Sequence, residues 1–117
     1  MPVRKIENKS VEIYQAKDGA IELSVDAGKE TIWANLDQIS EVFGRDKSVI
    51  SRHIKNIFKN AELRKDSVVA FFATTARDGK TYNVEYFNLD VILSVGYRVN
   101  SKQATNFRIW ANKILKQ

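Results

Sequence analysis

The chain has 117 residues, of which 44% are apolar, and its formal net charge is +5. This length suits one domain with one modest core. The absence of cysteine excludes disulfides and thiol chemistry, and one histidine without cysteine argues against a structural zinc site. No apolar run approaches membrane-spanning length, and the first residues lack the apolar core of a signal peptide. We therefore expect a soluble, cytoplasmic protein with no cofactor, metal or membrane contact.

Charge is unevenly distributed along the chain. Residues 1–41 contain eight acidic and five basic residues, whereas residues 42–117 contain six acidic and fourteen basic residues. From Val91 to the end there is no Asp or Glu, while Arg98, Lys102, Arg108, Lys113 and Lys116 are present. A polyanion is therefore a reasonable partner.

The chain begins with a polar segment and an amphipathic hairpin. Residues 1–10 are polar and of mixed charge, so we expect a flexible N-terminus without a regular element. Apolar and polar residues alternate over 11–15 and 20–25 around Asp18-Gly19, which is a strong hairpin signal. The outward residues of this hairpin are mainly acidic, among them Glu12, Glu22 and Asp26. We therefore place it away from nucleic acid.

Residues 30–34 predict a short strand that leads into a helix. Thr31, Ile32 and Trp33 favour the strand, in which Trp33 is placed to anchor the core. Stacking of Trp33 on a base is its alternative role. Asn35 can cap the following helix, and Gln38 is placed to complete a capping box.

Residues 35–58 together predict two short helices about a tight turn. Gly44 tolerates the left-handed backbone that ends the first helix, and Asp46 can cap the second. In the second helix, apolar residues at helical spacing predict a buried stripe, namely Ile50, Ile54, Ile57 and Phe58. The pattern is typical of a helix-turn-helix.

The outward face of the second predicted helix is cationic and polar. It carries Lys47, Ser48, Ser51, Arg52, Lys55 and Lys59, and Arg45 occupies the turn before it. Such side chains suit phosphates and the base edges of a major groove, so we expect this helix to read DNA. The alternative is an ordinary charged surface helix in a protein that never contacts DNA.

A second hairpin follows the helix pair. Residues 68–74 form an apolar, β-prone run that predicts a buried strand, and residues 81–87 return after a turn at Asp78-Gly79. A strand, two helices and a hairpin are the element order of a winged helix. Arg77 and Lys80 at the hairpin tip would then reach the DNA backbone or minor groove; the alternative is an ordinary charged turn.

Two helices complete the predicted fold. Asn88 can cap a helix that is apolar nearly all round over 89–95, and Gly96 permits a close crossing. A last helix opens at Asn100 or Ser101, with Phe107, Trp110, Ala111 and Ile114 inward. We expect an α+β, winged helix-turn-helix-like domain over residues 11–117, with an N-terminal β-hairpin and two C-terminal helices. Because the last helix stops without Gly, Pro or a charged tail, we expect the domain to be the N-terminal part of a longer protein.

Catalysis is poorly supported by the residue pattern. His53 lies among Ser51, Arg52 and Lys55 with no carboxylate nearby in sequence. The acidic residues after Glu41 are scattered singly, and no Gly-rich loop suits a phosphate. We therefore do not expect an enzyme.

Three stretches together resemble the RhuM family of bacterial virulence proteins: VFGRDKSVISRHIKNIF, DGKTYNVEYFNLDVI and VGYRVNSKQATNFRIWANKIL. The GYRVNS run followed by FRIWA is the most specific part. The resemblance covers most of the chain and implies a bacterial DNA-binding protein, similar in outline to phage antirepressor-type domains. Members of this family usually continue past the point where this sequence ends, and the resemblance brings no catalytic residues.

These features predict a sequence-specific double-stranded DNA-binding domain of a bacterial transcription regulator. The expected DNA contacts are Arg45, Lys47, Ser48, Ser51, Arg52, Lys55, Lys59, Arg77 and Lys80. The alternative is a protein-interaction module that uses the helix pair as a scaffold and binds an acidic partner, such as a toxin domain. A homodimer is compatible with the sequence in either case.

Overall fold

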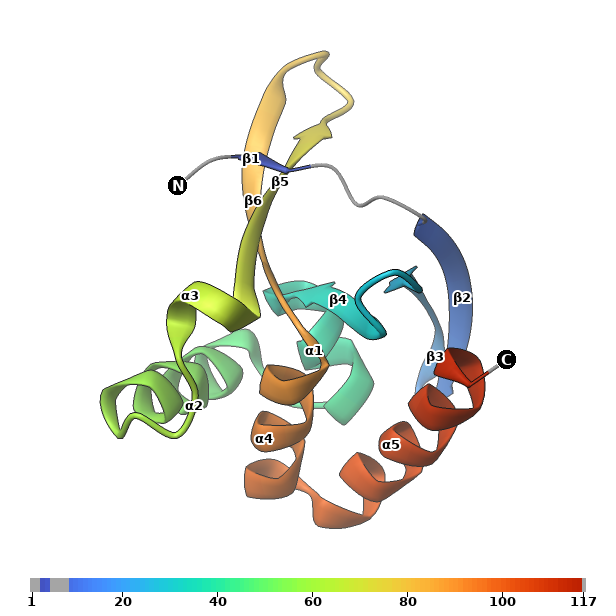
Figure 1. The fold of residues 1–117 in the computed structure, drawn as a ribbon, viewed down its shortest axis with the longest axis vertical. Helices are drawn as coiled ribbons and strands as arrows, with labels where there is room; N and C mark the ends of the chain where they lie inside the picture. The colour runs from blue at the N-terminus through green and yellow to red at the C-terminus, as the bar shows by residue number, and fades with distance from the viewer. Residues whose placement is uncertain (1–2, 5–8, 117) are drawn as a thin grey trace.

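The computed structural model describes residues 3–4 and 9–116 (Figure 1). In these residues six strands form one sheet, and five helices accompany it. The strands are β1 (Val3–Arg4), β2 (Lys9–Ala16), β3 (Gly19–Asp26), β4 (Thr31–Asn35), β5 (Val69–Thr75) and β6 (Thr81–Phe87). The helices are α1 (Leu36–Phe43), α2 (Lys47–Lys59), α3 (Lys65–Val68), α4 (Leu89–Val99) and α5 (Ser101–Leu115). This arrangement confirms the predicted α+β class.

The sheet joins the two predicted hairpins into one layer. Its strand order is β1-β5-β6-β4-β3-β2, with every neighbouring pair antiparallel except β1 and β5. Strand β4 connects the hairpins, because Trp33 pairs with Ser24 of β3 while Ala34 pairs with Phe87 of β6. The sequence predicted the two hairpins as separate units. It did not predict that β4 would join them into one sheet.

The N-terminal hairpin is confirmed, but the predicted outward position is wrong for two of its acidic residues, Glu12 and Asp26. Glu12 is half-buried because it shares a strand face with the buried Tyr14 and Ala16, whereas Val11 and Ile13 are 52% and 59% exposed. Strands β2 and β3 pair from Lys9 with Asp26 to Ala16 with Gly19, and Glu22 is exposed as expected. Asp26, in contrast, is only 5% exposed. Its Oδ1 accepts a hydrogen bond from the Lys29 backbone N–H at 3.2 Å. The turn toward β4 therefore draws this carboxylate inward, because a turn N–H provides the partner that a buried acid needs.

The predicted flexible N-terminus falls largely on residues 1–2 and 5–8, which lie outside the described residues. Val3 and Arg4 form the short strand β1, parallel to Phe71 and Phe72 of β5, and β2 already begins at Lys9. Pairing with β1 satisfies backbone hydrogen-bonding groups along the outer edge of β5. No local sequence signal predicts this pairing.

Helices α1, α4 and α5 enclose the main core with the sheet. Its fully buried members include Ile32 of β4, Phe43 of α1, Ile92 of α4 and Phe107 of α5. Gly96 of α4 lies where the helices cross, since a Cβ there would stand 2.5 Å from Phe43 Cζ and 2.9 Å from the Ala104 Cβ. The predicted close crossing at Gly96 is therefore confirmed.

Trp33 is buried as predicted, but in a second, smaller cluster. It is 4% exposed and packs with Ala70, Phe72 and Tyr86. Its ring meets Phe72 edge-on, with ring centroids 5.6 Å apart. Burial leaves no free face of the indole for a base to stack on, which removes the alternative role of Trp33.

The second hairpin, β5–β6, projects from the body of the molecule (Figure 1). Its strands pair from Val69 with Phe87 at the root to Thr75 with Thr81 near the tip. The short helix α3, which the sequence analysis missed, precedes β5 and takes up Val68, the first residue of the predicted strand. A four-residue helix is too short to show an apolar period.

Candidate nucleic-acid interface

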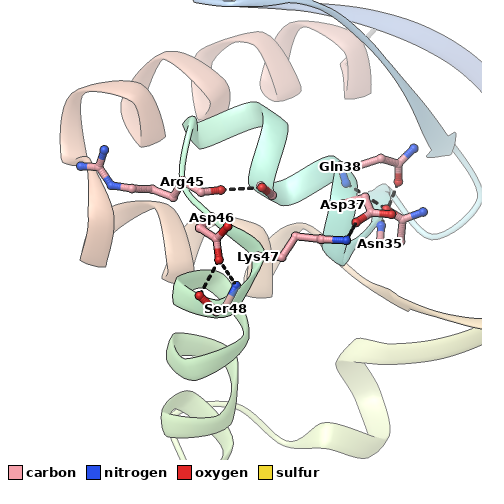
Figure 2. A network of polar contacts seen from close by, with 8 residues as sticks. Asn35, Asp37, Gln38, Arg45, Asp46, Lys47 and Ser48 are labelled. Atoms are coloured by element: carbon pink, nitrogen blue, oxygen red, sulfur yellow. Dashed lines mark hydrogen bonds and ion pairs between the residues drawn. The ribbon is translucent and has the colours of Figure 1, made fainter.

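Local hydrogen bonds define where the helix pair α1–α2 begins and turns (Figure 2). Asn35 Oδ1 accepts from the Gln38 backbone N–H at 2.9 Å, and Gln38 Oε1 accepts from the Asn35 backbone N–H at 2.8 Å. Gly44 ends α1 with φ of 63°, a left-handed conformation. Asp46 then caps α2 by accepting from the Ser48 backbone N–H at 2.9 Å. The predicted caps and helix boundaries are therefore confirmed.

Helix α2 has one buried and one exposed side. Ile50, Ile54 and Ile57 are between 0% and 6% exposed, as the predicted stripe requires. The opposite side presents what we call the α2 row: Lys47, Ser48, Ser51, Arg52, Lys55 and Lys59, of which Ser51 is half-buried and the others are exposed. The helical period therefore assigned the three isoleucines correctly, whereas Phe58, predicted in the same buried stripe, is only half-buried because it borders a groove beside α2.

Two members of the α2 row are held by neighbouring side chains. Lys47 Nζ lies 3.1 Å from Asp37 Oδ1, an exposed ion pair of the kind that contributes at most about 1 kcal/mol. Ser48 Oγ donates to Asp46 Oδ2, and the two hydrogen bonds from Ser48 lower the pKa of the Asp46 carboxyl. Arg52, Lys55 and Lys59 make no ion pair with any described residue. These three cations are consequently the ones most available to a partner.

Arg45 lies apart from the α2 row. Its side chain and that of Lys47 extend in opposite directions from the turn (Figure 2). Arg45 Nη2 donates to the Val99 carbonyl at the end of α4, at 3.0 Å. Arg45 therefore links the α1–α2 turn to the C-terminus of α4, a role that no sequence signal indicated.

A groove of about 600 Å³ runs beside the α2 row. One wall is α2 and the start of α1; the other walls are α3 and β6. The lining residues are Asn35, Leu36, Asp37, Lys47, Ser48, Ser51, Ile54, Lys55, Phe58, Lys65, Val84, Glu85 and Phe87. Sequence reasoning missed Lys65 and Glu85, because only packing of the hairpin root and α3 beside α2 brings them to the row.

The hairpin tip carries the other predicted contacts. Arg77 and Lys80 are exposed in a turn that Asp78 organises, accepting from the Lys80 backbone N–H at 2.9 Å and from the Tyr82 hydroxyl at 3.0 Å. The tip and α2 lie far apart in the molecule (Figure 1). The structure therefore does not bring Arg77 and Lys80 together with the α2 row, and only an extended partner could contact both.

His53 lies on the flank of α2 that faces α4. Burial lowers its pKa, and the positive charges of Arg52 and Arg98 lower it further. Arg98 of α4 pairs with Glu62, which follows α2. This ion pair links α4 to the segment that follows α2.

The described residues include no group of three or more His, Asp and Glu placed to hold a metal ion. In the same part of the chain, no helix has the length and apolar character needed to cross a membrane. The C-terminal cations predicted to face solvent, Lys102, Arg108, Lys113 and Lys116, are exposed on or beside α5.

Comparison with known proteins gives a family match for the second part of the chain. Residues 67–117 match the model of the virulence protein RhuM family. The matched residues include β5, β6, α4 and α5, whereas the α1–α2 pair lies outside them. No curated protein and no solved structure matches the chain at a significant level. The match confirms the family resemblance for the C-terminal stretches: residues 67–117 are similar to the virulence protein RhuM family.

Proposed function

We propose that this chain is a winged helix-turn-helix-like domain of a bacterial transcription regulator that binds double-stranded DNA sequence-specifically. The α2 row carries the proposal: cationic and small hydrogen-bonding side chains occupy the side of α2 opposite its buried isoleucines. Major-groove recognition needs such a face, because cations contact phosphates while Arg and Ser reach base edges. The domain acts in the cytoplasm and has no catalytic role in this proposal.

In the proposed complex, α2 lies in the major groove. With 13 residues it is about 20 Å long, and a groove about 12 Å wide admits it. Arg52 points away from Ile50 and Ile54, toward the base edges. Lys47 and Lys59, near the two ends of α2, contact phosphates.

The β5–β6 hairpin serves as the wing. Its tip is too far from α2 to share a small ligand, whereas a duplex extends over such a distance. Arg77 and Lys80 contact the DNA backbone or minor groove beside the site that α2 reads. This arrangement accounts for exposed cations on two separate elements.

Titration of the protein with a DNA duplex tests the proposal. We expect binding at low salt, with an affinity that falls steeply as the salt concentration rises, because bound cations release counterions from DNA. A control acidic protein is titrated in parallel, since salt weakens both kinds of association. Absence of detectable duplex binding at low salt would contradict the proposal.

A protein-interaction module is the second candidate function. The groove beside α2 has an apolar floor that includes Leu36, Ile54, Phe58 and Phe87, and apolar floors are typical of peptide and protein contacts. In that case the acidic protein, and not the duplex, would saturate the basic surface at low salt. The paired titrations therefore distinguish the two functions.

A further inference from the structure

The groove beside α2 contains charges of both signs. Lys47, Lys55 and Lys65 line it together with Asp37 and Glu85. Lys47 and Asp37 neutralise each other at 3.1 Å. The remaining charges are two lysines, on α2 and α3, and the carboxylate of Glu85 on β6.

Glu85 places a negative charge in a groove proposed to face DNA. It is half-buried and has no ion pair or side-chain hydrogen bond with any residue that the structure describes. A partly buried charge is screened less by salt than a fully exposed one. Its field therefore acts directly on whatever enters the groove.

The walls of the groove match the two chemical faces of a DNA strand. Lys55 and Lys65 are exposed and suit phosphates, while Ile54, Phe58 and Phe87 suit the apolar surface of deoxyribose or a thymine methyl group. The groove also borders Ser48 and Ser51 of the α2 row. When α2 occupies the major groove, one strand of the duplex must therefore pass beside this wall.

Building on the proposed function, we propose that the groove between α2, α3 and β6 takes one DNA strand, in which Lys55 and Lys65 attract phosphates and Glu85 repels them. At a preferred site, base contacts from α2 hold the strand in one register, with phosphates at the lysines. On random DNA no register is favoured, so phosphates also approach Glu85. Glu85 thereby weakens non-specific binding more than specific binding, and acts as a specificity-determining residue.

The experiment uses two charge-matched pairs of variants. Glu85→Gln removes the carboxylate and nearly preserves its shape; Glu22→Gln makes the same change at an exposed position on β3, away from the groove. Lys65→Ala removes a groove cation; Lys17→Ala is its control in the β2–β3 turn. Affinities for a selected duplex and for a random duplex are measured at one salt concentration on folded preparations.

We expect Glu85→Gln to tighten binding of random duplex about three- to tenfold more than Glu22→Gln does, and to tighten the selected duplex less. Lys65→Ala should weaken both duplexes and reduce the slope of log affinity against log salt by about 1. Because one of these changes is a gain in affinity, misfolding cannot imitate it.

Three results would overturn the inference. Equal effects of Glu85→Gln and Glu22→Gln, in a domain whose wild type binds DNA, would remove the groove from the DNA path and leave the proposed function standing. Loss of acidic-protein binding in Lys65→Ala, with duplex binding unchanged, would assign the groove to a protein partner. No duplex binding by the wild type would remove both proposals.

Discussion

Arg52 is the residue on which sequence reading by α2 depends most directly. Ile50 and Ile54 pack into the core on one side of the helix, so Arg52 faces solvent on the other, with no ion-pair partner in the described part of the chain. Its planar guanidinium can donate two parallel hydrogen bonds to guanine O6 and N7, which a lysine cannot do in the same geometry. In the proposed complex, single residues of α2 therefore differ in role: Arg52 reads bases, whereas Lys47 and Lys59 contact phosphates.

Arg52→Ala should weaken binding to a preferred site by about 1 to 3 kcal/mol and affect random DNA less, with the fold intact. The measurement compares both affinities on the same preparation at one salt concentration. Lys59→Ala, in the last turn of α2, is the matched control and should lower both affinities equally. Equal losses in Arg52→Ala would remove Arg52 from the base-reading role.

At the scale of elements, the helix crossing at Gly96 holds the C-terminal helices against α1. A side chain at Gly96 would meet the Phe43 ring at 2.5 and 2.8 Å and the Ala104 Cβ at 2.9 Å, and all three residues are buried. Contacts this short require the ring or the helices to move, and a packed core accommodates such movement at a cost. The orientation of α2 depends on this packing, since α2 contacts α1 and α4.

Gly96→Ala should lower the free energy of unfolding by about 1 to 3 kcal/mol, although Ala is the better helix former by about 1 kcal/mol. Denaturant unfolding measures the change. Ser94→Ala in the same helix is the control for helix propensity and should shift stability by less than about 0.5 kcal/mol. A stabilising Gly96→Ala would show that the crossing relaxes freely.

Phe43→Leu should offset part of the loss in the double variant, because it removes the ring atoms that clash.

At the scale of the whole molecule, cations lie on three separate parts: the α2 row, the hairpin tip and helix α5. The α5 cations are exposed and make no ion pair among the described residues, so no neighbour orients them toward base edges. We expect them to add to the general attraction for DNA and to leave sequence preference to α2.

The double variant Lys102→Ala and Lys113→Ala should therefore weaken duplex affinity without changing the preferred sequence. Selection of bound duplexes from a random pool, for wild type and variant, measures both quantities. A changed consensus in the variant would contradict this assignment and place α5 in the base-reading surface.

Much of the local structure could be predicted from the sequence, because its causes lie within a few residues. The capping box of Asn35 and Gln38, the left-handed Gly44 and the Asp46 cap each involve neighbours in the chain. The helical period likewise separated the buried isoleucines of α2 from Arg52 and the rest of the α2 row. Both hairpins followed from β-prone segments on either side of Asp-Gly turns.

The rest depended on contacts between distant segments, which no local pattern encodes. Pairing of β4 with β6 united the two hairpins. Pairing of β1 with β5 placed a strand in a segment for which the sequence predicted no regular element. Tertiary packing directed Arg45 to the end of α4 and brought Lys65 and Glu85 beside α2. The sequence by itself determined which side of α2 is cationic, because a 3.6-residue period is local. Only the tertiary structure decided what stands opposite that side, since the walls of a groove come from segments whose separation along the chain leaves their pairing open.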